Sequence, residues 1–151
     1  MKMGKIILFA LLLFVTTLSY SPTFTLSTEV GQGFKFIDYQ NPQFYMVEST
    51  VKPAVNFLDG KLNATSIVMG VFSDGVSYIF GGTGAGYEVF RKEDFAVELG
   101  ATALFGSEGK VLYGLNAALN FNKTVYASIN ARQEYTQKEF WFDGGIGFKI
   151  Y

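Results

Sequence analysis

From Thr23 onward, apolar and polar side chains alternate with a period of two, and no window places apolar residues at helical spacing for three turns. Seven short clusters of turn-forming residues interrupt this alternation. They are Asp38 to Gln43, Asp59-Gly60, Ser73 to Gly75, Arg91 to Asp94, Gly106 to Lys110, Asn122 to Thr124 and Thr136 to Glu139. The intervening strands hold roughly 10 to 15 residues, close to the 9 to 11 with which a tilted strand spans a bilayer. The pattern predicts an all-β fold, an eight-stranded antiparallel up-and-down transmembrane β-barrel with short turns.

Following the alternation through the seven turns assigns large apolar side chains to one face of the sheet. Members of this face include Phe24, Leu26, Val30, Val47, Val51, Val68, Phe72, Val76, Tyr78, Phe80, Leu99, Leu115 and Ile129. The same assignment places Gly82, Gly84 and Gly86 on this face, where they form a strip without side chains. The other face carries small, polar and charged residues, so the two faces differ sharply in polarity.

The size of the apolar face decides which side is outside. The interior of about eight strands holds only a few layers of side chains, and some thirty large apolar residues do not fit there. We therefore expect the apolar face to point toward lipid and the polar face to fill the interior. The alternative is a soluble, exported, lipocalin-like barrel that has the opposite faces inside and out and binds a small apolar ligand. Pro53 is unusual in either barrel, because proline cannot donate to a strand ladder.

Strand register predicts charge pairs inside the barrel. If the first hairpin turns about Gln40-Asn41, Glu29 lies directly opposite Lys52, and Lys35 is diagonal to Glu48. If the last hairpin turns about Gln137-Lys138, Arg132 lies opposite Asp143. A buried charge is costly unless paired, so this complementarity suits an interior. Chance pairing on a solvated face is the alternative.

The first residues indicate export. Met1 to Lys5 is basic, and Ile6 to Leu18 is an apolar run too short for a membrane-spanning helix. We expect residues 1–20 to be a cleaved signal peptide and residues 21–151 to be the barrel domain, with an uncleaved anchor as the alternative. Only 17% of the chain is charged, against about 25% in typical soluble domains.

The last strand adds a family resemblance. Asp143-Gly-Gly145-Ile-Gly-Phe148-Lys-Ile150 fits the polar-x-Gly-x-x-hydrophobic-x-hydrophobic assembly signal of small bacterial outer-membrane barrels, except that Tyr151 follows the usual end. With its signal peptide, the chain resembles the group of the OmpA transmembrane domain and OmpX. The resemblance implies location in the bacterial outer membrane, contact with membrane lipid and insertion by the barrel assembly machinery, with Asp143, Gly145, Phe148 and Ile150 forming the signal. The short exterior turns are unlike the long loops of adhesive members.

Candidate chemistry is sparse. The chain has no histidine, no cysteine and no run of alternating Asp and Asn residues, so the usual general base and the usual metal-ligand patterns are absent. Glu134 with Asp143 could still act as paired carboxylates, but Arg132 between them indicates a salt bridge, and we expect no catalysis, no cofactor and no metal site. Gly81 to Gly86 lacks the spacing and the following helix of a phosphate-binding loop. Its outward glycines, Gly82, Gly84 and Gly86, could instead contact a lipid chain or a second barrel. Basic residues do not cluster, which argues against nucleic acid, and about eight strands leave no wide pore. A structural or interaction role remains.

Overall fold

The computed structural model describes residues 22–38, 44–136 and 138–151. The expected signal peptide at 1–20 lies outside these residues, as does most of the first turn. Across the described ranges, no helix is long and apolar enough to cross a membrane.

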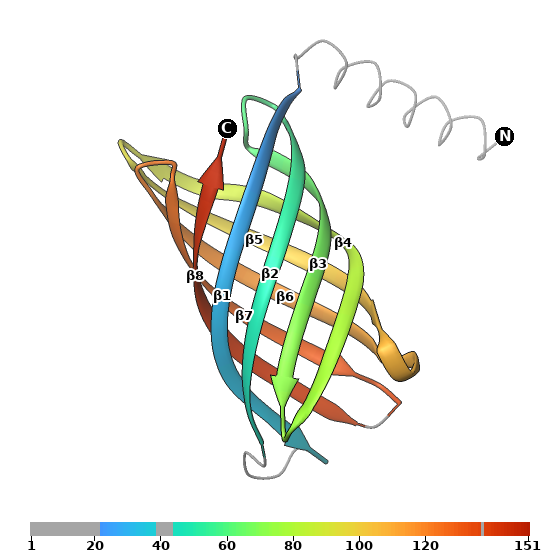
Figure 1. Ribbon diagram of the computed structural model, residues 1–151. Coiled ribbons are helices and arrows are strands. Elements are labelled where there is room, and N and C mark those ends of the chain that lie inside the picture. Colours follow the sequence, from blue (N-terminus) through green and yellow to red (C-terminus); the bar gives the residue numbers. More distant parts are fainter. Residues whose placement is uncertain (1–21, 39–43, 137) are drawn as a thin grey trace, which may run out of the picture.

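Eight antiparallel strands form one closed barrel, in which every strand pairs with its neighbours in sequence and β1 pairs with β8 (Figure 1). The prediction of an eight-stranded up-and-down barrel is confirmed. The strands are β1 (Thr23–Ile37), β2 (Phe44–Phe57), β3 (Leu62–Ser73), β4 (Val76–Lys92), β5 (Phe95–Gly106), β6 (Val111–Phe121), β7 (Val125–Glu134) and β8 (Glu139–Ile150).

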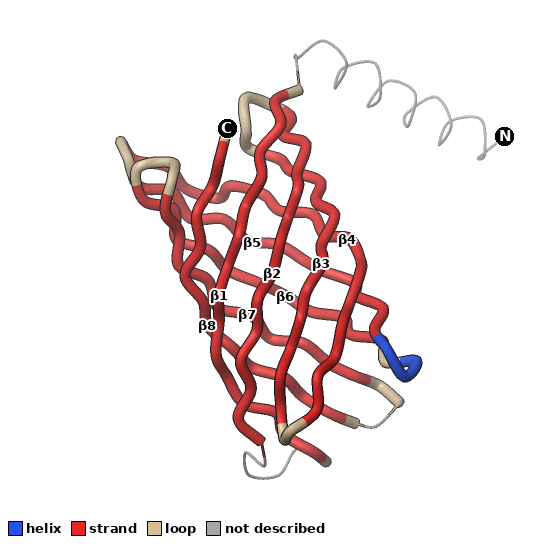
Figure 2. The backbone as a smooth tube through the Cα atoms, in the orientation of Figure 1, coloured by secondary structure: helices blue, strands red, loops and turns tan. Residues whose placement is uncertain are grey.

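The barrel has two distinct ends. At the terminal end, β1 begins and β8 ends, and short turns join β2 to β3, β4 to β5 and β6 to β7 (Figure 2). At the distal end lie the other four connections, including the 3₁₀ turn η1 (Ser107–Gly109). The tightest distal turn is Asp74-Gly75, whose φ angles of 54° and 73° are both left-handed. That conformation favours an Asp-Gly pair and matches the twist of a hairpin.

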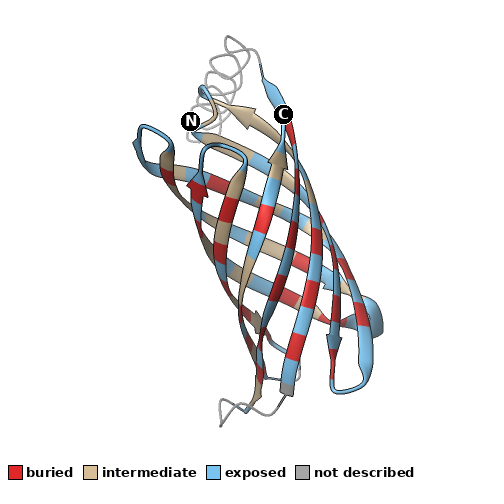
Figure 3. Ribbon diagram, turned by 60° about the vertical axis from the view of Figure 1, so that its left-hand side comes forward, coloured by how far each residue is buried: buried red, intermediate tan, exposed pale blue. Residues whose placement is uncertain are grey.

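Burial alternates along the strands as the sequence predicts (Figure 3). In β1 the odd-numbered positions from Thr25 to Lys35 are buried. The even-numbered positions, such as Phe24, Leu26 and Phe34, are exposed. Large apolar side chains thus cover the outside of the barrel, and the inside is the buried, mostly polar face.

One segment departs from the predicted faces. The sequence count placed Tyr78 and Phe80 outward, but both are buried inside the barrel, and Gly82, Gly84 and Gly86 also lie on the inward side. The cause is the β3–β4 turn, which contains two residues instead of the expected three, because Ser73 pairs with Val76. The face assignment in this half of β4 is therefore wrong.

A β-bulge restores the expected faces farther along β4. The β4–β5 register shifts between Glu88 and Phe90, so that Val89 and Phe90 are both exposed. The extra residue of a bulge changes the parity of the strand. The two deviations cancel, which explains why the predicted faces hold again from Phe90 onward.

The outward strip on β4 is formed by Gly81, Thr83 and Ala85. The inward position of Gly82, Gly84 and Gly86 therefore gives no support to a contact between barrels through these three glycines.

Candidate functional site in the barrel interior

The barrel interior is layered along its axis. An open polar cavity lies toward the terminal end, a group of buried charges lies in the middle, and an apolar cluster lies toward the distal end. The order follows from the strands: along β8, the inward residues from the terminal to the distal end are Lys149, Asp143, Trp141 and Glu139, separated by glycines near the terminal end.

Arg132 is the centre of the charged layer. Its Nη1 lies 2.6 Å from Asp143 Oδ2 and 2.8 Å from Glu48 Oε2, so one guanidinium serves two carboxylates from β2 and β8. Asn130 donates a hydrogen bond of 2.6 Å to the other oxygen of Asp143. All of these side chains are buried. Because a buried ion is costly without partners, this group joins three strands only as a complete set.

Glu29 forms the second ionic group. Lys52 Nζ lies 2.6 Å from one carboxylate oxygen of Glu29, and the Ser128 hydroxyl donates a 2.7 Å hydrogen bond to the other. The pair joins β1 to β2, and the hydrogen bond from Ser128 connects it to β7, on the other side of β8. Both oxygens of this buried carboxylate therefore have partners.

The structure brings Glu29 to Lys52 and Arg132 to Asp143, although neither pair is directly opposite in the sheet. Thr50 is opposite Glu29, and Trp141 is opposite Arg132. In each hairpin the expected register is wrong by two residues, a shift that preserves the faces. Long side chains then reach across the diagonal.

The expected proximity of Lys35 to Glu48 is wrong. Lys35 Nζ lies 3.7 Å from Glu139, while Glu48 binds Arg132. Glu139 also forms an ion pair with Lys110 at 3.1 Å. It accepts a hydrogen bond of 2.9 Å from the indole N–H of Trp141. The sequence reasoning missed Glu139 and Lys110 because it placed both in turns.

An apolar plug occupies much of the distal half of the interior. We define this plug by the buried side chains that form the interior cluster: Met46, Ile67, Met69, Val71, Tyr78, Phe80, Leu104, Leu112 and Trp141. The rings of Phe80 and Trp141 meet edge to face, with centroids 5.6 Å apart. Aromatic pairs favour this geometry. The sequence prediction missed the plug because it placed Tyr78 and Phe80 outside.

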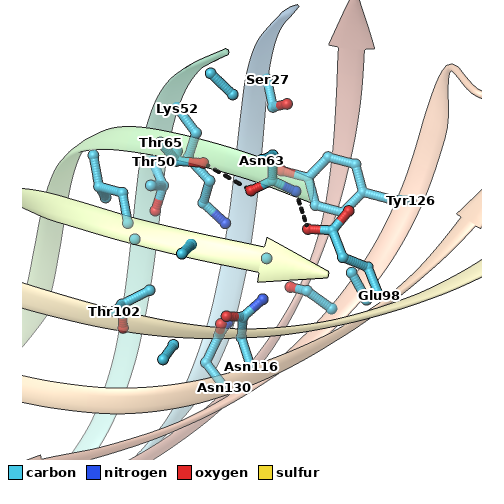
Figure 4. Close-up of a pocket in the computed structure, with 18 of the residues that line it drawn as sticks. Ser27, Thr50, Lys52, Asn63, Thr65, Glu98, Thr102, Asn116, Tyr126 and Asn130 are labelled. Atoms are coloured by element: carbon cyan, nitrogen blue, oxygen red, sulfur yellow. Dashed lines mark hydrogen bonds between the residues drawn. The ribbon is translucent and has the colours of Figure 1, made fainter. Parts of the chain in front are cut away.

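A polar cavity of about 80 Å³ lies on the terminal side of the charges, and its lining includes Thr50, Lys52, Asn116 and Tyr126 (Figure 4). A wider mouth of about 310 Å³ follows at the terminal end. Lys52 and Lys149 lie 5.8 Å and 5.5 Å from the centre of the Tyr126 ring.

The absence of a side chain at Gly86 leaves room for two polar side chains of the cavity wall. A Cβ atom at Gly86 would lie 2.5 Å from Glu98 Oε1 and 2.8 Å from Asn63 Nδ2. Asn63 donates a 2.9 Å hydrogen bond to Glu98, which Figure 4 marks. A larger residue at position 86 would therefore displace this bond.

The carboxylates near the cavity are held in ion pairs. Among the described residues, no group of three or more metal-ligating side chains could hold a metal ion. The carboxylates of Glu29, Glu48 and Asp143 are bonded to cations, so they serve as ion-pair partners.

The residues of the expected assembly signal all lie on β8. Asp143 is buried in the charged layer, whereas Phe148 and Ile150 are exposed on the outer face. A Cβ atom at Gly145 would lie 2.8 Å from Glu29 Oε1, so this glycine leaves space for the carboxylate.

Comparison with solved structures identifies similar folds. Neisserial surface protein A aligns with a TM-score of 0.69 and 9% sequence identity, over 86% of this chain and 98% of that one. A de novo designed transmembrane β-barrel gives a TM-score of 0.54 and 16% identity, over 83% and 95%. The designed barrel TMB2.3 gives 0.52 and 13%, over 84% and 94%. No protein-family model and no curated protein matches the chain. These similarities show that the chain has the fold of the small eight-stranded membrane barrels.

The shared guanidinium predicts a graded mutational response. Arg132→Met should lower the free energy of unfolding by about 3 to 5 kcal/mol, because it leaves Glu48 and Asp143 buried without their cation. Adding Asp143→Asn should recover part of the loss, and adding Glu48→Gln as well should recover most of it. Reversible urea titration of the refolded protein measures these values.

The matched control is Lys149→Met, which removes a partly exposed cation 3.5 Å from Glu98. Its cost should stay within about 1 kcal/mol. Equal losses for Arg132→Met and Lys149→Met would contradict the central role of Arg132.

The plug predicts protection of Trp141, the only tryptophan of the chain. Its fluorescence should be quenched weakly by acrylamide, because the side chain is fully buried. Phe80→Ala should increase quenching and cost about 3 to 5 kcal/mol through the cavity it leaves. Ile79 precedes Phe80 and faces outward, so Ile79→Ala should leave quenching unchanged. Strong quenching of Trp141 in the unaltered protein would contradict the burial of this side chain in the plug.

Proposed function

We propose that the protein is an integral β-barrel of the bacterial outer membrane with a structural or interaction role. The observation that carries this proposal is the reversed polarity of its faces. Leu115, Ile146 and Phe148 are 55 to 69% exposed, whereas Glu48 and Asp143 are 1% exposed. In water this arrangement would leave an apolar surface far larger than the patches that soluble monomers tolerate.

A lipid environment removes this difficulty. Outward apolar side chains then face hydrocarbon, and closure of the eight described strands pairs each of them on both sides, as a bilayer requires. The soluble lipocalin-like alternative requires the opposite arrangement, with apolar residues lining a ligand cavity. The polar lining of the cavity at the terminal end supports the membrane interpretation.

The plug supports the absence of a wide pore. Phe80, Trp141 and Leu112 are fully buried in the distal half of the interior, where an open channel would need space. Eight-stranded barrels have interiors that side chains can fill. Together with the ion-paired carboxylates, this favours a non-catalytic role in the envelope over transport or hydrolysis.

Export and assembly complete the proposal. Residues 1–20 would be removed on export, residues 21–151 would insert, and Asp143, Gly145, Phe148 and Ile150 would be read by the barrel assembly machinery. The four distal turns would face the cell exterior, where their shortness favours a compact surface.

Adjacent residues on β6 test the membrane assignment. Leu115→Arg should lower the free energy of unfolding in lipid bilayers by about 2 to 4 kcal/mol, because Leu115 faces the proposed hydrocarbon. Asn116→Arg should cost less in solvation, because Asn116 faces the polar cavity. Equal tolerance of the two variants in a lipid refolding titration would argue against a lipid-facing outer surface.

Two aromatic residues on the same face of β8 test the assembly signal. Phe148→Ala and Phe142→Ala should refold similarly as purified proteins, because both side chains are exposed. In cells, only Phe148→Ala should accumulate in the periplasm. Normal envelope insertion of Phe148→Ala, measured by fractionation, would contradict the proposed signal.

A further inference from the structure

The polar cavity at the terminal end has the properties of a ligand site. We propose that it binds a small, uncharged molecule with several hydroxyl groups, which enters from the terminal end. The proposal rests on the interior geometry and does not depend on the membrane location.

Two buried hydroxyl groups in the cavity have unused hydrogen-bonding capacity. Thr50 and Tyr126 are 2% and 3% exposed, and among the described residues the Thr50 hydroxyl has no hydrogen-bond partner, whereas the Tyr126 hydroxyl has only a contact with Glu29 that falls outside normal hydrogen-bond geometry. Both line the cavity. A buried polar group without a partner is costly, so each favours a molecule that supplies one. Because hydroxyls both donate and accept, a hydroxylated ligand matches them.

The neighbouring carboxylate does not remove this need. Glu29 already binds Lys52 and Ser128 and also interacts with the Tyr126 hydroxyl as a charge and as a hydrogen-bond acceptor. That interaction uses only the hydroxyl proton of Tyr126, so its oxygen can still accept a hydrogen bond from a molecule in the cavity.

The charges of the cavity argue against an ionic ligand. Lys52 is paired with Glu29, Lys149 lies 3.5 Å from Glu98, and Arg132 is held by two carboxylates. An anion would be repelled by the carboxylate beside each cation, and a cation would be repelled by the cation beside each carboxylate. A neutral ligand leaves these pairs intact.

The size and the apolar floor define the ligand further. A volume of about 80 Å³ corresponds to several water positions at roughly 10 to 15 Å³ each, which suits a three-carbon polyol. Ile67 and Leu104 belong both to the plug and to the cavity lining. They offer apolar contact to the carbon atoms of such a molecule, and the rest of the plug lies on the distal side of them.

Glycerol is the probe for the test. Titration of the refolded protein in detergent, followed by two-dimensional amide NMR, should give saturable shifts confined to residues around the cavity. Tyr126→Phe and Thr50→Val should each weaken binding roughly two- to tenfold, the effect of losing one hydrogen bond. Thr50→Val removes a hydroxyl without a protein partner, and Tyr126→Phe leaves Glu29 paired with Lys52 and Ser128, so the fold should remain.

An adjacent pair of alanines provides the matched control. Ala118 lines the cavity, and its neighbour Ala117 faces outward. Ala118→Phe should abolish the saturable shifts, and Ala117→Phe should leave them unchanged. Should Ala118→Phe fail to fold, the two hydroxyl variants still decide the result.

Three outcomes would overturn the proposal. The first is a set of shifts that rise linearly with glycerol throughout the spectrum. The second is an affinity for glycerol in Tyr126→Phe and Thr50→Val equal to that of the unaltered protein. The third is saturable binding of inorganic phosphate in place of glycerol, which would assign the cavity to an anion.

Discussion

The closure of β1 onto β8 is the constraint on which the rest of the structure depends. Residue pairs join these strands along their length, from Leu26 with Ile150 to Ile37 with Glu139. Once the sheet is closed, each side chain points either inward or outward, and a shift by one residue would exchange the two faces. The ion pairs, the plug and the apolar exterior all follow from this division into two faces, which the bulge in β4 shifts by one residue.

Much of this architecture is predictable from the sequence because alternation and turn residues are local signals. The failure in β4 shows the limit of local reasoning. Whether Ser73 belongs to the turn or to the strand decides the direction of Tyr78 and Phe80, and the sequence offers no separate signal for it. The bulge near Val89 then hides the error, because it restores the faces of the following strands.

The interior site was less predictable because its members come together across the barrel. Strand register predicted the pairs of Glu29 with Lys52 and Arg132 with Asp143, and long side chains compensated for an error of two residues in that register. The additional contact of Glu48 with Arg132 joins strands that do not neighbour each other in the sheet. Such contacts depend on the stagger of the closed barrel, which hairpin counting does not provide.

The layered interior also divides the barrel into two parts that differ in packing density. The plug and the Arg132 group form a dense distal half in which most substitutions disturb several partners at once. The terminal half is lined by small polar residues such as Thr102 and Asn116 around open space. A substitution in the cavity lining therefore disturbs fewer contacts than one in the distal half, so the two halves of one barrel differ in how much change the fold tolerates.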